Sequence, residues 1–211
     1  TERKRIMEIK QLEEQFNPHF IFNVLETLRY EIAIDTAKAS DMVMAFANLM
    51  RYSIYYGSTI VPLQTDIEYI NDYLLLQKMR YNRRLNYHID IPEELMGCKI
   101  PKLLLQPVVE NSLVHGMKDI RSIAINISAW KEKGQLKLCV EDNGSGIREE
   151  KLEELRKGLE REDVYREHIG LYNSHRVVRL LYGPESGMTI ESSPGNGTKV
   201  TVTLPADMEE I

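Results

Sequence analysis

The stretch Asp142-Asn143-Gly144-Ser145-Gly146-Ile147 (DNGSGI) follows an alternating apolar run and carries a carboxylate ahead of two closely spaced glycines. A strand that ends in this way offers an acceptor for an exocyclic amine, and its glycines let the backbone approach a flat ring. One interpretation is therefore an adenine pocket. The other is an Asx turn whose glycines supply positive φ, and the stretch alone does not decide between them.

Residues 107–115 (PVVENSLVH) lie upstream of this stretch in a predicted helix. Asn111 and His115 are four residues apart and share one helix face, whereas Glu110 lies about 100° away around the helix. The amide oxygen of Asn111 suits Mg²⁺, which prefers oxygen ligands and bridges substrate phosphates. Glu110 could polarise or deprotonate a reacting group. The alternative is a solvated polar face with a histidine near the helix C-terminus, where the macrodipole favours it.

Two more glycine motifs follow along the chain. In residues 168–173 (HIGLYN), Gly170 opens a helix after a charged segment, and unpaired amides at a helix N-terminus bind phosphate. A simple helix start, however, needs no ligand. Residues 195–198 (GNGT) join the last two predicted strands and, on local grounds, form a hairpin turn. Neither motif identifies a site alone, but the order of all four motifs carries weight.

The second half of the chain alternates between twofold and helical periodicity. Twofold alternation predicts strands at residues 85–91, 123–129, 136–140, 188–192 and 198–204. Helical spacing predicts helices at residues 101–116, 149–160 and 170–183. Together these elements predict an antiparallel or mixed sheet with helices on one face, which is an α+β sandwich.

Helical spacing of apolar residues dominates the first half. From about residue 8 to residue 52 it predicts one long helix, kinked or started afresh at Pro18. Thr65 and Glu68 have the spacing of a capping box, which predicts a second helix through about residue 83. An all-α helical hairpin of this kind leaves apolar stripes uncovered, and dimerisation into a four-helix bundle would cover them.

Bulk composition sets further bounds. The chain has 211 residues, of which 43% are hydrophobic and 28% charged, enough for one large or two small globular domains with real cores. We expect two domains, at residues 1–84 and 85–211. A net charge of −5 provides no general basic field, so we expect no nucleic-acid binding and expect local groups to meet any anionic ligand.

Cysteine usage and hydropathy indicate the compartment. Cys98 and Cys139 are the only cysteines and lack CxxC spacing, which indicates a reducing compartment and no zinc site. No apolar run approaches the ~20 residues needed to cross a bilayer, and no signal peptide is present. We expect a soluble chain, and because it begins at Thr1 without a methionine, we infer a fragment of a longer protein.

In their order along the chain, the motifs of the second half resemble the Bergerat ATP-binding fold shared by gyrase, MutL and the sensor histidine kinases. The corresponding residues are Glu110 and Asn111 in the N box, Asp142, Gly144 and Gly146 in the first glycine box, Gly170 and Leu171 in the second, and the closing pair Gly197 and Thr198. This resemblance implies ATP as substrate, Mg²⁺ held by Asn111, and a nucleotide-binding set that also includes His115.

The sequence is similar, over nearly its full length, to sensor histidine kinases of the LytS and YesM type. The similarity is carried by residues 15–23 (QFNPHFIFN), 50–53 (MRYS), 61–63 (VPL) and 105–111 (LQPVVEN). It implies the cytoplasmic kinase core of a two-component sensor, in which His19 receives the γ-phosphoryl group of ATP and passes it to an aspartate of a separate response regulator. It also implies a homodimer and a membrane-anchored full-length protein, with no membrane contact by this fragment.

The chemistry of His19 supports the same role. A neutral imidazole has a free ring lone pair at cytoplasmic pH and can attack phosphorus. Asn23 lies four residues further on the same helix face and is our candidate for holding the other ring nitrogen. The alternative is a core histidine packed beside Phe16, Phe20 and Phe22.

The sequence departs from the family pattern at three positions. Phe20 follows His19 where many histidine kinases have Glu or Asp, so either Glu110 serves as general base or none is needed. Pro107 stands where many have a second Asn, which the LytS and YesM group tolerates. His168 stands where the second glycine box often begins with Gly.

Two other functions fit the same motifs. One is a GHKL-type ATP-hydrolysing clamp like MutL, in which nucleotide drives dimer closure. The other is a degenerate, non-catalytic signalling scaffold, which Phe20 and His168 would favour. In a kinase, a basic side chain would help to neutralise the phosphates, and Arg51 is a candidate that could equally pair with acids of the hairpin.

Overall fold

The computed structural model of the chain describes residues 18–55, 59–118, 120–160 and 169–206. Phe16 and His168, which entered the predictions above, lie outside these ranges. In the described part of the chain, no helix is both long enough and apolar enough to cross a membrane.

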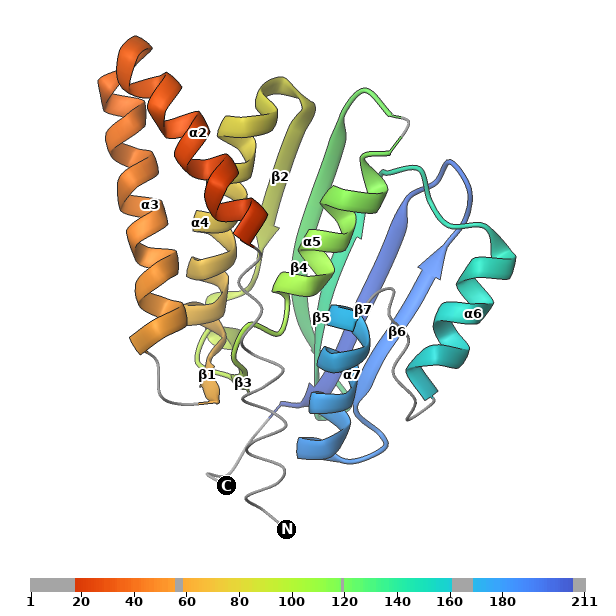
Figure 1. Ribbon diagram of the computed structural model, residues 1–211. Coiled ribbons are helices and arrows are strands. Elements are labelled where there is room, and N and C mark those ends of the chain that lie inside the picture. The colour runs from red at the N-terminus through yellow and green to blue at the C-terminus, as the bar shows by residue number, and fades with distance from the viewer. Residues whose placement is uncertain (1–17, 56–58, 119, 161–168, 207–211) are drawn as a thin grey trace.

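The first half of the described chain contains a helical hairpin. It is formed by α2 (Pro18–Ile34) and α3 (Thr36–Tyr55), which lie side by side and run in opposite directions (Figure 1). The single helix predicted from residue 8 to residue 52 is therefore wrong, because the chain turns at Asp35. Oδ1 of Asp35 accepts a hydrogen bond from the backbone N–H of Lys38 at 3.1 Å, so Asp35 caps the start of α3.

Helix α4 (Leu63–Tyr81) joins this helical layer and begins before the predicted capping box. The box does not form, because Pro62 precedes the helix without a side-chain cap and Glu68 accepts a hydrogen bond from the Gln64 side chain at 2.9 Å. Instead, the first backbone N–H of α4 donates to the carbonyl oxygen of Cys98 at 2.8 Å. Tertiary backbone pairing thus replaces the predicted cap.

The hydrophobic core is continuous from the helical layer into the second half of the chain. Met42 and Leu49 of α3 and Ile70 of α4 are fully buried in it. The ring of Phe20 on α2 lies 5.0 Å from the ring of Tyr73 on α4, measured between centroids. Phe20 therefore anchors α2 to α4.

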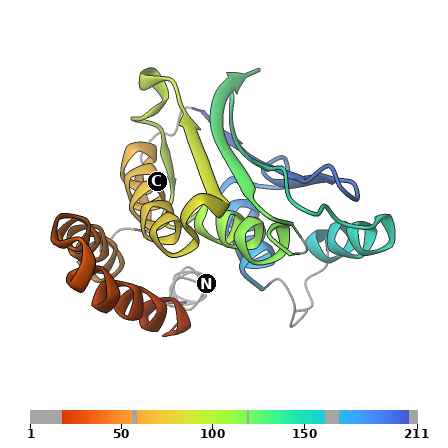
Figure 2. The ribbon, with the colours of Figure 1, turned by 90° about the horizontal axis from the view of Figure 1, so that it is seen from above.

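The second half is built on a five-stranded mixed sheet with the order β2-β4-β5-β7-β6. Its strands are β2 (Leu85–Asp90), β4 (Ile123–Glu132), β5 (Gln135–Asp142), β6 (Gly187–Ser192) and β7 (Thr198–Pro205). β2 and β4 are parallel, and the other neighbouring pairs are antiparallel. One face of the sheet is covered by α5 (Gln106–Asn111), α6 (Glu149–Glu160) and α7 (Ile169–Tyr182) (Figure 2). The predicted α+β sandwich is confirmed.

Alternating side chains place the core on the face that the helices cover. In β4, Ile125 and Ile127 are buried while Asn126 between them is exposed, as the twofold period of a strand requires.

A separate antiparallel pair, β1 (Ile60–Pro62) with β3 (Lys99–Pro101), was not predicted. This pair connects the start of α4 to the segment ahead of α5.

The helix predicted at residues 101–116 is shorter than expected. Pro101 ends β3, and α5 ends at Asn111, where a π-helical turn over Ser112–Gly116 takes over. Between β3 and α5 the chain passes through Leu103, whose φ of +59° lies in the left-handed region that is strained for a leucine. Pro107, rather than Pro101, occupies the first turn of the helix.

Asp66 of α4 is a fully buried carboxylate where the helical layer meets the sandwich. Its Oδ1 accepts hydrogen bonds from the Tyr52 hydroxyl at 2.9 Å and from the backbone N–H of Leu103 at 2.7 Å. Among the described residues, its Oδ2 has no hydrogen-bond partner. Burial raises the pKa of Asp66 to about 6, although these hydrogen bonds and the charge of Lys102 act in the opposite direction.

Replacing Asp66 with asparagine should remove a pH dependence of stability. The folded protein holds this proton up to a pH of about 6, whereas the unfolded chain loses it near the ordinary pKa of 3.8. The stability associated with protonated Asp66 is therefore fully present below the unfolded pKa and lost as the pH rises through the folded one, by about 3 kcal/mol. Urea unfolding near pH 4 and near pH 7 measures it. Parallel pH profiles for the native protein and Asp66→Asn would contradict this prediction.

Candidate active site

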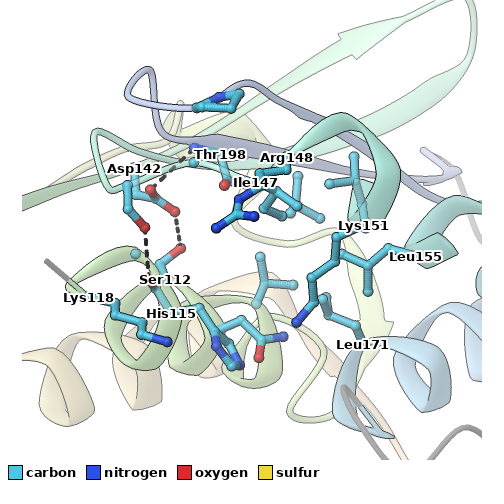
Figure 3. Close-up of a pocket in the computed structure, with 18 of the residues that line it drawn as sticks. Ser112, His115, Lys118, Asp142, Ile147, Arg148, Lys151, Leu155, Leu171 and Thr198 are labelled. Carbon is cyan, nitrogen blue, oxygen red and sulfur yellow. Dashed lines mark hydrogen bonds between the residues drawn. The ribbon is translucent and has the colours of Figure 1, made fainter. Parts of the chain in front are cut away.

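A cavity of about 500 Å³ lies among α5, the end of β5, the start of α6 and the loop before β7 (Figure 3). Six of the predicted nucleotide-binding residues line it: Asn111, His115, Asp142, Gly146, Leu171 and Thr198. Motifs that are far apart in the sequence therefore meet in one place.

Asp142 is a fixed carboxylate at the end of β5, with 4% of its surface exposed. Its Oδ1 accepts hydrogen bonds from the backbone N–H groups of Gly144 at 2.8 Å and Thr198 at 3.2 Å, and its Oδ2 accepts one from the Ser112 hydroxyl at 2.7 Å. Burial raises the pKa of Asp142, and these three hydrogen bonds oppose the rise. The arrangement holds an acceptor in one orientation at the cavity.

Two glycines let the DNGSGI loop pack directly against the loop before β7. Gly146 has a φ of +68°, and a Cβ atom there would lie 1.9 Å from the carbonyl oxygen of Ser193. Gly197 has a φ of +76°, and its Cβ would lie 1.8 Å from the carbonyl oxygen of Asp142. The two interpretations of the stretch are thus compatible, because the Asp142 side chain forms an Asx turn with Gly144 and also lines the cavity.

Glu110 points to a different side of α5 from Asn111, and His115 of the π-helical turn lines the cavity together with Asn111. Its Oε1 accepts a hydrogen bond from the Gln106 side-chain amide at 2.8 Å, and Gln106 accepts one from the Tyr69 hydroxyl of α4 at 3.0 Å. Burial raises the pKa of Glu110, and the Gln106 hydrogen bond opposes this. Glu110 therefore faces the helical layer, and the residues that line the cavity do not include it.

The second glycine motif contributes packing as well as cavity surface. Leu171 is buried and lines the cavity near the start of α7. A Cβ atom on Gly170 would lie 2.8 Å from Cβ of Pro107, so the glycine lets α7 approach α5 closely. This contact also involves the position at which many histidine kinases have a second Asn.

His19 is an exposed residue in the first turn of α2. The Asn23 amide nitrogen lies 3.1 Å from its Nδ1 and 3.5 Å from its Nε2, the contact that four-residue spacing predicts. Phe20 is 8% exposed and Phe22 is 71% exposed, so the aromatic neighbours do not enclose the ring on both sides. The alternative of a core histidine is wrong.

Two family models match the chain. One describes histidine kinases and matches residues 7–85, and the other describes histidine kinase-, DNA gyrase B- and HSP90-like ATPases and matches residues 99–208. The chain belongs to the histidine kinase family. The first match includes His19 and the helical hairpin, and the second includes the cavity.

This histidine kinase is similar to the sensor protein kinase HptS of Staphylococcus aureus (strain USA300), with 32% identity over 206 residues, 97% of this chain and 40% of HptS. The chain thus spans about 40% of the length of the curated relatives it matches. Among solved structures, it resembles the histidine kinase domain of the Erythrobacter litoralis EL346 blue-light activated histidine kinase, with a TM-score of 0.51 and 17% identity over 97% of this chain and 96% of that one. It also resembles the catalytic domain of histidine kinase ThkA, with a TM-score of 0.55 and 15% identity over 72% and 98%. These likenesses confirm the predicted fold class.

The kinase cavity also contains polar side chains that the sequence patterns did not indicate. They are Ser112, Lys118, Arg148, Glu150 and Lys151. Arg148 and Lys151 extend from the start of α6 into the cavity (Figure 3). Arg148 directly follows DNGSGI, and this adjacency is the one signal that could have found it. Arg51, the predicted candidate cation, does not line the cavity and donates a hydrogen bond to Asn48 at 3.4 Å.

Proposed function

We propose that His19 takes the γ-phosphoryl group of ATP held in the cavity and later passes it to an aspartate of a response regulator. The observation that carries this proposal is an exposed histidine whose ring contacts Asn23, in a chain that also builds a cavity around the fixed carboxylate of Asp142. The first feature supplies a nucleophile, and the second supplies a place for its substrate.

The residues of the cavity fit an adenine nucleotide. Oδ2 of Asp142 accepts from Ser112 and retains a second lone pair that suits the exocyclic amine of adenine. Val108, Leu155 and Ile190 supply apolar surface for the base.

Asn111 is the residue that would hold Mg²⁺. Within the described ranges, no group of three or more His, Cys, Asp or Glu residues could hold a metal. One amide oxygen at the cavity nevertheless fits a magnesium ion that takes its other ligands from phosphates and water. Such an ion would neutralise charge on the phosphates.

The Asn23 contact orients the ring of His19 for attack. The nitrogen and oxygen of a side-chain amide exchange places when it turns by 180°, and Asn23 Oδ1 would then accept from Nδ1–H. This tautomer places the basic lone pair of the ring on Nε2, which is the nitrogen that attacks. The Nε2–phosphorus bond forms while the bond to the bridging oxygen breaks, and that oxygen leaves with the electron pair on ADP. Attack by Nε2 leaves the ring positively charged, with its proton still on Nδ1. Glu110 is our candidate acceptor for this proton, since its side chain faces the helical layer that carries His19 rather than the cavity.

Labelling separates this proposal from its rivals. Incubation with γ-labelled ATP and Mg²⁺ should give the chain an acid-labile phosphate. A GHKL-type clamp would release free phosphate without labelling the protein. A non-catalytic scaffold would bind no ATP analogue in calorimetry.

The wider setting follows from the same proposal. We infer that the phosphotransfer part is residues 1–84 and the ATP-binding part residues 85–211. Family matches over residues 7–85 and 99–208 support this division. We further infer a cytoplasmic kinase core that belongs to a membrane-anchored sensor and does not bind nucleic acid.

We infer that the hairpin pairs with a second copy of the chain to form a four-helix bundle. Exposed apolar side chains gather on α2 and α3: Phe22, Leu25, Ile32, Val43 and Met44 are between 46% and 71% exposed. A second hairpin would remove this surface from water.

Replacing Phe22 and Leu25 together with glutamate should therefore dissociate the dimer. Burying each apolar side chain contributes about 1.5–3 kcal/mol, so the double variant should weaken dimerisation by about 100-fold or more. Sedimentation at micromolar concentration measures this. Trp130→Glu is the control, because Trp130 is an apolar side chain on β4 with 37% of its surface exposed. Equal masses for the native chain and the double variant would contradict the bundle.

A further inference from the structure

Asp66 occupies a place where a carboxylate is costly. It is fully buried, and in the described chain one of its oxygens has no partner. Replacing a buried ionic group by an apolar one of similar volume is often neutral or stabilising. Stability therefore does not explain why a carboxylate stands at this position. We look for the reason in the groups that Asp66 contacts.

The first partners fasten the segment ahead of α5 to the end of α3. Oδ1 of Asp66 accepts from the Tyr52 hydroxyl, in the last turns of α3, and from the backbone N–H of Leu103. Leu103 holds a left-handed φ of +59°, which persists in a leucine only when the surroundings impose it. Nζ of Lys102 donates to the carbonyl oxygen of Ser53 at 3.3 Å, which ties the same two segments together again.

A second contact from α4 holds the start of α5. The Tyr69 hydroxyl, three residues beyond Asp66, donates to Oε1 of Gln106, which begins α5. Helix α5 is six residues long and ends at Asn111. A helix this short spans only about 9 Å and moves as one piece, so a shift at its start reaches Asn111.

We propose that Asp66 and Tyr52 are positioning residues of the kinase reaction, which hold the turn at Leu103 so that α5 presents Asn111 in a fixed relation to the helices that carry His19. This inference rests on the proposed function. The other wall of the cavity has support outside α5, because Oδ1 of Asp142 accepts hydrogen bonds from the backbone N–H groups of Gly144 and Thr198. Base binding should consequently survive the loss of Asp66, whereas phosphoryl transfer should not.

Asp66→Leu tests the proposal, since leucine fills the site without accepting either hydrogen bond. A misplacement on the order of 1 Å costs about 100-fold, so we expect kcat for autophosphorylation to fall by about 10- to 100-fold. The Kd for adenosine should change by less than about threefold, because Asp142 is untouched. Asp66→Asn keeps the Oδ1 acceptor and should retain a kcat within about threefold of the native chain.

Gln77→Leu is the matched control. Gln77 is another buried polar residue of α4, and its amide donates to Tyr73 of the same helix at 2.8 Å rather than to the segment ahead of α5. Its kcat should stay near the native value. A Leu103→Gly change added to Asp66→Leu should recover part of the lost rate, because glycine adopts positive φ without strain.

The outcomes are distinguishable. A native kcat in folded Asp66→Leu, or an equal fall in Gln77→Leu, would overturn the inference alone. If Asp66→Leu fails to fold, Tyr52→Phe replaces it, because it removes one of the two donors to Oδ1, and a native kcat there would have the same meaning. Absence of histidine labelling in the native chain would overturn the proposed function and this inference with it.

Discussion

Replacing His19 with glutamine should abolish phosphoryl labelling of the chain. Glutamine has no ring nitrogen with a basic lone pair, so the expected fall in rate is about 1,000-fold or more. His19 is exposed, so the substitution should change the free energy of unfolding by no more than about 0.5 kcal/mol. ATP binding should be unchanged, because His19 does not line the cavity.

The measurement is acid-labile incorporation from γ-labelled ATP, with adenosine affinity followed in parallel. His88→Gln is the matched control, since His88 is an exposed histidine on β2, away from the helical hairpin. It should label like the native chain. Persistent acid-labile label in His19→Gln would remove His19 from the mechanism, and label lost equally in both variants would point to a general defect.

The periodic elements of the second half were predictable from the sequence. Strands on a sheet with one covered face tend to alternate buried and less buried side chains, and β4 and β7 show this alternation clearly. In β5 the alternation is interrupted, because Cys139 is buried as well as its neighbours Leu138 and Val140. The prediction for residues 149–160 agrees with the bounds of α6, because its apolar residues recur at helical spacing within a charged stretch.

Two predictions for the first half of the chain, the single long helix and the capping box, were wrong for physical reasons that hydrophobic periodicity does not show. Apolar spacing continues across Asp35, so the turn there shows only in the capping preference of one carboxylate. At α4, the capping-box pattern of Thr65 and Glu68 was overridden, because the pairing of β1 with β3 places a backbone acceptor at the helix start. The start of α4 therefore depends on a contact between segments distant in the sequence, which no local pattern shows.

At the candidate site, too, local spacing predicted some features, whereas others depend on contacts between segments. Helical spacing predicted that Asn111 and His115 share a face and that Glu110 does not, and the cavity lining agrees. The sequence could not show that Glu110 is held toward α4 by Gln106, because this requires knowing which helix packs against α5. The sequence also did not indicate that Arg148 and Lys151 line the cavity. The charged sequence of α6, which begins directly after Arg148, resembles that of any surface helix.

Replacing Asp142 with asparagine should remove nucleotide binding while preserving the fold. Asparagine can keep Oδ1 as acceptor for the N–H groups of Gly144 and Thr198, and its Nδ2 can donate to Ser112 once that hydroxyl rotates. What it cannot do is accept from the amine of adenine, because Nδ2 would face that amine donor to donor. A lost charged hydrogen bond together with an unpaired donor costs about 3 kcal/mol, or roughly 100-fold in Kd.

Calorimetry with adenosine and with an ATP analogue distinguishes base recognition from phosphate binding. Both ligands should lose affinity by the same factor in Asp142→Asn, because the missing contact is to the base that they share. Glu141→Gln, the exposed neighbour on β5, is the control and should bind both normally. In Asp142→Asn, the ratio of the affinities for adenine and guanine should also fall, since Nδ2 can donate to the guanine carbonyl. Unchanged adenosine affinity in a folded Asp142→Asn variant would show that the base lies elsewhere, and the cavity would then have to bind its nucleotide in another orientation.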